Sequence, residues 1–313
     1  MFCRLAIVLL LAALQSSAAA AEGKKKIVFL PGKQSHGWSG HAYTADCKLL
    51  ARLLNENVPQ VEATVLEGGW PQDTRPLEEA AAIIVACDAN GVVGPEANWK
   101  KLDDLAKTGK GIAFVHYSLD PGNEPGQHIK AMIGGYYEQH WSVNPFWRAE
   151  FKSLPEHPIA RGVKPFAIDD EWYYHMRFQD GMKNVTPILT AIPPDRTREG
   201  EDGPHSGNPT VRSGKGQPEH VAWAYERADG GRGFGFSGGH THWSYAHDQY
   251  RKLLLNAAVW LAKVEVPANG VETKRPTAKE MEANLEGERP KKWTEAQTQR
   301  IIDAINAGKR VAG

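Results

Sequence analysis

The first half of the chain alternates short apolar runs with segments of helical period. The run KIVFLP at residues 26–31 is apolar and precedes Gly32, as expected of a buried strand that enters a loop. Apolar spacing predicts helices over residues 42–57 and 96–108, the second ending at Gly109. Further strands are predicted at residues 61–67, 81–88 and 111–118. Strands that alternate with helices predict an α/β fold with a mainly parallel sheet and helices on both faces.

The second half has more strand patterns and one strong helix. Strands are predicted at residues 147–152, 186–192, 220–226 and 231–237, with a polar surface loop at residues 195–216. The segment YRKLLLNAAVWLAK, residues 250–263, predicts a closing helix. Beyond it the composition shifts to Lys, Glu, Thr and Pro, and only residues 294–307 have helical period. We expect one α/β domain over residues 24–265 and a charged tail, residues 266–313, that docks on the domain or stays mobile.

Residues 1–21 have the pattern of a secretory signal. Arg4 supplies the positive start, residues 5–14 the apolar segment, and residues 17–21 the small side chains of a cleavage zone. The apolar segment is too short to span a bilayer. The sequence therefore predicts a secreted or periplasmic protein without a membrane anchor.

The charge of the chain is balanced, with 37 basic and 37 acidic side chains in 313 residues. A general nucleic-acid binder needs a basic excess to neutralise phosphates, so nucleic acid is not expected as a partner. The composition does not indicate an oligomeric state. The unusual feature of the composition is its content of 12 His and 10 Trp. These two residue types are therefore the first candidates for site residues.

Two cysteines, Cys47 and Cys87, follow the predicted signal, which contains Cys3. In an oxidising compartment they could form a disulfide. They could equally be buried structural thiols, and a nucleophilic role is a third interpretation. The spacing in the sequence does not decide among the three.

Several histidines follow predicted strands. They are His36 and His41 after the first strand, His116 at the end of the strand at residues 111–118, and His240 and His242 after the strand at residues 231–237. The carboxyl ends of parallel strands share one edge of a sheet, so distant segments can bring imidazoles into one crevice. Glu171 is the acidic partner, although it could also belong to a solvated acidic turn with Asp170. Imidazole and carboxylate together perform general acid/base chemistry or bind a metal.

The tryptophans give a second indication. Three of them, Trp99, Trp223 and Trp260, fit core faces of predicted helices or strands. Four others lie close in sequence to the candidate site segments, namely Trp38, Trp141, Trp172 and Trp243. Aromatic rings beside polar groups suit the apolar faces of sugars, and they also suit ordinary core packing.

Read in order, the motifs resemble the ThuA-like family, named after trehalose utilisation. The likeness covers residues 24–263 and is carried by GIAFVHYS, IGGYYEQHW, HPIARGVKPFAIDDEWYY, HVAWAYE and GRGFGFSGGHTHWSY. It implies a flavodoxin-like fold of the class I glutamine amidotransferase type, a three-layer sandwich around a mainly parallel sheet. Amidotransferase relatives use a Cys nucleophile where this chain has His116, Tyr117 and Ser118. The resemblance therefore does not imply glutaminase activity.

The resemblance also implies a function in carbohydrate metabolism, on a glycoside or a keto-glycoside. The expected catalytic residues are Glu171 and His240 for proton transfer, together with His116. A divalent metal such as Zn²⁺ would be held by His36, His116 and His240. Substrate contacts are expected from His36, Trp38, His140, Trp172, Tyr173, His242 and Trp243. The hydrolase, lyase and isomerase classes stay open, as does a non-catalytic carbohydrate-binding or interaction module on the same fold.

Overall fold

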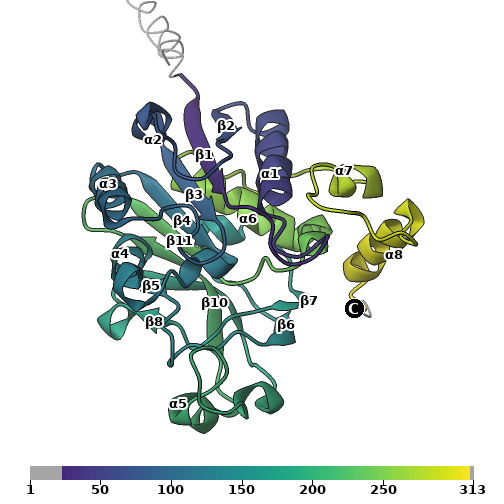
Figure 1. Cartoon of the computed structure of the whole chain (residues 1–313). Helices are drawn as coiled ribbons and strands as arrows, with labels where there is room; N and C mark the ends of the chain where they lie inside the picture. The colour runs from purple at the N-terminus through teal and green to yellow at the C-terminus, as the bar shows by residue number, and fades with distance from the viewer. Residues whose placement is uncertain (1–22, 311–313) are drawn as a thin grey trace, which may run out of the picture.

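A computed structural model describes residues 23–310, so the predicted signal at residues 1–21 lies outside the described residues. Its central sheet consists of β1 (Lys25–Pro31), β2 (Val61–Val65), β3 (Ala82–Ala86), β4 (Gly111–Val115), β9 (Val185–Ala191), β10 (Glu219–Glu226) and β11 (Arg232–Phe236). The seven strands lie in the order β2-β1-β3-β4-β11-β10-β9 (Figure 1). The first five run parallel, and β10 is antiparallel to both of its neighbours. The mainly parallel sheet expected from the sequence is thus confirmed.

Helices cover both faces of this sheet because its strands are apolar on both sides. Alternate residues of β1 belong to two different apolar clusters, Ile27 and Phe29 to one and Val28 to the other. The first face is covered by α1 (Tyr43–Asn57) and α6 (Asp248–Leu261), and the second by α2 (Arg75–Glu79), α3 (Glu96–Lys107) and α4 (Asn123–Ile133). The fold is therefore a three-layer α/β sandwich.

Strand β7 (Phe166–Glu171) is the unpredicted element that matters most. It pairs antiparallel with β6 (Phe146–Phe151) outside the central sheet. The acidic residues of this segment do not form the apolar pattern of a buried strand. Asp170 is nevertheless fully buried, because its carboxylate accepts hydrogen bonds from the backbone N–H groups of Gly239 and Thr241. This pairing places Glu171, the last residue of β7, beside the segment that follows β11.

The other unpredicted elements have weak patterns. Helix α4 contains Pro125 and Gly126, which are poor helix formers. A five-residue helix, α5 (Pro209–Ser213), lies inside the predicted loop and begins after Asn208, whose side chain accepts hydrogen bonds from two backbone N–H groups. The remaining short pair is β5 (Gly135–Tyr136) with β8 (Arg177–Phe178).

The C-terminal segment packs on the domain. It contains α7 (Ala278–Glu282) and α8 (Glu295–Asn306), the second of which occupies the predicted helical stretch. Met281 of α7 and Ile302 of α8 are fully buried and belong to the same apolar cluster as α1. Of the two alternatives left open by the sequence, docking is the one observed for residues 266–310.

Both described cysteines are free and buried, so they form no disulfide. Cys47 lies in α1, and Cys87 directly follows β3. Burial raises the pKa of the Cys87 thiol to about 12. Such a thiol stays protonated near neutral pH, which disfavours the nucleophilic role for Cys87.

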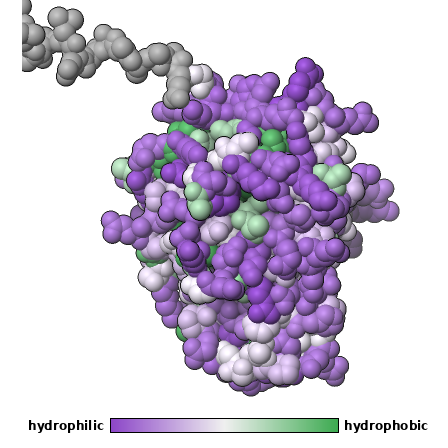
Figure 2. All heavy atoms as spheres, turned by 90° about the vertical axis from the view of Figure 1, so that its left-hand side faces the viewer, coloured by the Kyte–Doolittle hydropathy of each residue, from purple (hydrophilic) through white to green (hydrophobic). Residues whose placement is uncertain are grey.

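The side of the molecule that carries α3 is mostly hydrophilic, with hydrophobic residues scattered among polar ones (Figure 2). Scattered apolar side chains of this kind are normal on a folded domain. Within residues 23–310, no helix combines the length and the apolar character needed to cross a bilayer.

Candidate functional site

The candidate site lies where several strands end. His41 follows β1, His116 follows β4 directly, and His240 lies four residues beyond β11. These strands are parallel, so their carboxyl ends share one edge of the sheet. Glu171 reaches the same edge from the end of β7. We call His41, His116, Glu171 and His240 the four-residue cluster.

The side chains of the four-residue cluster converge on a common centre. His41 Nε2 lies 3.0 Å from His116 Nε2 and 3.0 Å from His240 Nδ1. Glu171 Oε2 lies 2.9 Å from His240 Nδ1 and 3.4 Å from His116 Nε2. One ligand atom from each residue lies within 4.8 Å of all the others, the arrangement expected around a single metal ion.

Two residues of the cluster have uncommon backbone conformations. His41 has φ of 44° and His116 has φ of 57°, in the left-handed region that non-glycine residues rarely adopt. Backbone hydrogen bonds tie the two loops together, from His41 N–H to the His240 carbonyl at 2.9 Å and from His242 N–H to the Ser39 carbonyl at 2.9 Å. Residues in such conformations persist only where the surroundings hold them, and they are enriched at functional sites.

The outer hydrogen bonds fix the tautomers of two imidazoles. His116 Nδ1 lies 2.8 Å from the Ser237 carbonyl oxygen, which can only accept, so Nδ1–H donates. His41 Nδ1 lies 2.6 Å from Asp88 Oδ1 and donates to that carboxylate in the same way. In its neutral form, each ring therefore directs its Nε2 lone pair to the centre of the cluster, where the two Nε2 atoms are 3.0 Å apart. A shared proton or a bound cation is needed to offset the repulsion between them.

Burial and hydrogen bonding set the charges of the site. Burial alone would raise the pKa of Glu171, but its hydrogen bonds with His116 and His240 lower the pKa to about 2. Burial lowers the pKa of His41 to about 4, although its hydrogen bond to Asp88 acts in the opposite direction. Near neutral pH, Glu171 is thus ionised and His41 is neutral, and these are the forms in which both residues bind metals.

The structure brings together a different set of candidate ligands from the one expected, which was His36 with His116 and His240. His41 takes the place of His36, whose side chain is exposed. The His36 ring lies beside that of His41, with centroids 3.9 Å apart and planes tilted by 54°, and His36 forms a second candidate group with His41 and Asp88. For His41 to bind an ion in that second group through Nδ1, this nitrogen would have to lose the proton that it donates to Asp88. The four-residue cluster is therefore the better candidate for a metal site.

Two expected substrate contacts are structural residues instead. Trp172 is fully buried, and its ring packs against Phe236 and Tyr250 with centroids 5.4 and 5.8 Å away. His242 is 1% exposed and uses both nitrogens inside the protein, with Asp46 Oδ1 at 2.5 Å and the Met281 carbonyl at 2.6 Å. Neither side chain has a free face for a sugar, so the structure does not support either contact.

The other expected contacts fall into two groups. Tyr173 is buried and places its hydroxyl 3.4 Å from His116 Nε2, directly behind the cluster. Trp38 and Trp243 pack edge to face, with centroids 5.7 Å apart, and lie on the side of the C-terminal segment. His140 is exposed and lies outside the four-residue cluster, with its backbone N–H bonded to the Pro204 carbonyl. Trp141, the remaining tryptophan noted in the sequence, stacks on His175 at 4.5 Å.

Sequence reasoning missed two residues of the site. Asp88, two residues after β3, holds His41 and also accepts a hydrogen bond from the Tyr43 hydroxyl at 2.7 Å. Its place as the last residue of the strand predicted at residues 81–88 was the signal that could have found it. Phe146 is 53% exposed, and its ring meets that of His240 at 4.7 Å. An isolated phenylalanine carries no sequence signal of such a role.

Comparison with known proteins gives the family. The family model described as trehalose utilisation, ThuA, matches residues 28–261. No curated protein matches the chain.

Two solved structures have a similar fold. A putative ThuA-like protein from Bacteroides uniformis is 15% identical, with a TM-score of 0.56, and the match covers 79% of this chain and 95% of that one. Another from Parabacteroides merdae is 16% identical, with a TM-score of 0.51 and coverage of 82% and 94%. At this identity the two structures support the fold alone. Because the family model spans most of the chain, including the whole four-residue cluster, this protein belongs to the ThuA family.

Proposed function

We propose that the four-residue cluster binds one divalent metal ion such as Zn²⁺ and that this site transforms a carbohydrate by metal-assisted acid/base chemistry. The observation that supports the metal is the convergence of His41 Nε2 and His116 Nε2, 3.0 Å apart, beside the Glu171 carboxylate. A cation at the centre would coordinate both nitrogens in their neutral form together with the carboxylate.

The spacing of the cluster agrees with such an ion. Zinc–ligand distances of about 2.0–2.1 Å in a tetrahedron place neighbouring ligand atoms about 3.3 Å apart. Four of the six separations lie between 2.9 and 3.4 Å, and one ligand atom from each residue lies within 4.8 Å of all the others. The outer partners also fit, because metal-bound histidines commonly donate their second N–H to a carboxylate or a backbone carbonyl. Asp88 and Ser237 supply these two acceptors.

The protein residues would perform the proton transfers. A bound divalent ion supplies a Lewis acid that polarises a substrate oxygen. Glu171 Oε1 and His240 Nε2 make no hydrogen bond within residues 23–310, so Glu171 Oε1 can accept a proton from the substrate, and His240 Nε2–H can donate to a substrate oxygen. Both side chains are partly exposed, Glu171 at 14% and His240 at 17%, which places them at the open side of the cluster.

A carbohydrate substrate is supported by the family and by the surroundings of the cluster. The family is described by trehalose utilisation. The exposed ring of Phe146 lies against His240, where it offers an apolar face next to polar groups. We also propose that the protein acts after export, on the strength of the signal pattern in residues 1–21.

The test is product analysis of a panel of disaccharides and keto-glycosides with metal-free and zinc-loaded protein. The zinc-loaded protein is expected to form product, and Glu171→Gln and His240→Gln are expected to lower turnover at least about 100-fold. His128→Gln is the matched control, since His128 pairs with Asp103 on the far helices and lies outside the cluster. Binding of a sugar without any product, with or without zinc, would contradict catalysis and favour a binding module.

Replacing Asp88 with Asn should weaken zinc binding while keeping the shape of the site. The loss of the carboxylate weakens the hydrogen bond that orients His41, and outer partners of this kind contribute about 10-fold to 100-fold in metal affinity. A competition titration against a chromogenic chelator measures the change. Asp103→Asn is the control, because Asp103 forms the same kind of 2.6 Å contact with His128 away from the cluster. Equal affinities in the two variants would show that Asp88 does not support a metal ligand.

A further inference from the structure

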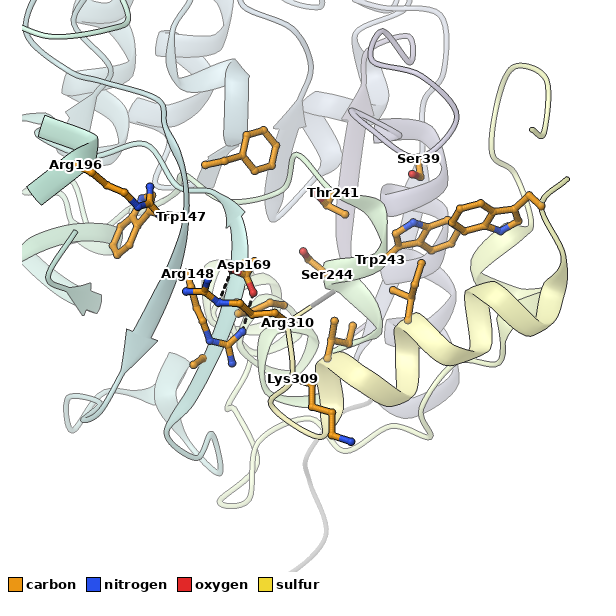
Figure 3. A pocket seen from close by; sticks show the side chains of 16 residues that line it. Ser39, Trp147, Arg148, Asp169, Arg196, Thr241, Trp243, Ser244, Lys309 and Arg310 are labelled. Carbon is orange, nitrogen blue, oxygen red and sulfur yellow. Dashed lines mark hydrogen bonds and ion pairs between the residues drawn. The ribbon is translucent and has the colours of Figure 1, made fainter. Parts of the chain in front are cut away.

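The C-terminal segment closes a pocket beside the four-residue cluster. The pocket has a volume of about 580 Å³ and lies between the β6–β7 pair and α8 (Figure 3). Phe146 lines it and also contacts His240, so the pocket and the cluster share one wall. Thr241, the residue after His240, lines it as well. A ligand in this pocket would therefore extend directly from the candidate catalytic centre.

One wall of the pocket comes from residues beyond the family match, which ends at residue 261. Trp293 stacks on Trp243, with ring planes 7° apart and centroids 6.1 Å apart. Ile301 and Ile305 of α8 also line the pocket. The wall is thus mainly apolar and aromatic, which suits the C–H face of a sugar ring.

This wall is firmly held. The Asn306 side chain donates to the Ala246 carbonyl at 3.0 Å and accepts from Asp248 N–H at 3.0 Å. Arg148 reaches across from β6 and donates to the Gly308 carbonyl at 2.6 Å. The pocket is therefore a formed feature of the fold, built before any ligand arrives.

The polar lining of the pocket carries an excess of positive charge. Its charged members are Arg148, Asp169, Arg196, Lys309 and Arg310. Asp169 pairs with Arg148 at 2.7 Å and with Arg310 at 4.0 Å (Figure 3). Arg196 and Lys309 have no acidic partner within the part of the chain that the structure describes. One carboxylate against four cations leaves a net charge of +3, in a protein whose total charge is zero.

We infer that this pocket binds a saccharide unit that carries a carboxylate, such as a hexuronic acid. The apolar wall would receive the ring, and the unpaired cations would attract the acid group. This inference rests on the proposed function only in taking the ligand to be a sugar. It names the substrate class of that site as an acidic glycoside.

The test compares 4-nitrophenyl β-glucuronide with 4-nitrophenyl β-glucoside, which differ only in the carboxylate. Calorimetry with the full chain is expected to show roughly tenfold tighter binding of the glucuronide, a preference that shrinks as salt is added. The double variant Arg196→Gln/Lys309→Gln should lose the preference and keep its affinity for the glucoside. Lys291→Gln is the control, because Lys291 is an exposed lysine of the same segment that does not line the pocket.

Each other result overturns the inference. Equal binding of the two sugars by the unaltered protein would do so, as would a preference that survives in the double variant, or the absence of binding. Repeating the measurement with metal-free protein separates this inference from the proposed function. A glucuronide preference that persists without metal, in a protein that forms no product, would uphold the pocket and reject the catalysis.

Discussion

Replacing His116 with Ala is expected to lower zinc affinity by more than about 100-fold. This loss exceeds the one expected for Asp88→Asn, because His116 is itself a proposed ligand, whereas Asp88 only orients one. The reason is geometric, since His116 Nε2 lies 3.0 Å from His41 Nε2 and 3.4 Å from Glu171 Oε2 at the centre of the cluster. Chelator competition with purified, metal-free protein measures the loss. Unchanged affinity would remove His116 from the ligand set.

A folding control is needed for this variant because His116 is fully buried. Removing its ring leaves the Ser237 carbonyl without its 2.8 Å partner, at a cost of about 1–3 kcal/mol. His116→Asn retains a donor in the same direction and reduces that cost. Both variants should lose zinc while their circular dichroism spectra match that of the unaltered protein.

Replacing Trp172 with Ala is expected to destabilise the fold by about 3–5 kcal/mol, the usual effect of removing a buried Trp. The ring is fully buried among Phe151, Phe236 and Tyr250. A Cβ on Gly238 would lie 2.6 Å from it, which shows how closely the surroundings fit. Urea unfolding measures the change in free energy of unfolding.

Trp38→Ala provides the comparison, because Trp38 is only partly buried and should cost less stability. A loss below about 1 kcal/mol in Trp172→Ala, together with weaker sugar binding, would restore the stacking role first expected for this residue.

The parallel part of the fold could be predicted because its strands are buried on both faces. Such strands read as continuous apolar runs, as in the residues of β1 and β3. Strand β7 could not be predicted, because Asp170 is buried through hydrogen bonds to distant backbone groups that the local sequence does not show. The docking of α8 was also undecided, since the partners of Ile302 lie far away in the chain.

The candidate site was predicted in outline and corrected in detail. The strand ends identified His116, His240 and Glu171 correctly as neighbours. The choice between His36 and His41 depended on a backbone turn, because His41 reaches the cluster with φ of 44° and His36 lies exposed beside it. Two residues five positions apart in one loop have no local pattern that separates them.

The most direct test of the metal centre is anomalous X-ray diffraction from crystals of the protein soaked in zinc, collected on both sides of the zinc absorption edge. The account predicts one strong anomalous peak among His41 Nε2, His116 Nε2, Glu171 Oε2 and His240 Nδ1, about 2.0–2.2 Å from each. A peak at His36 and Asp88 instead, or an empty cluster in crystals that bind zinc elsewhere, would contradict it.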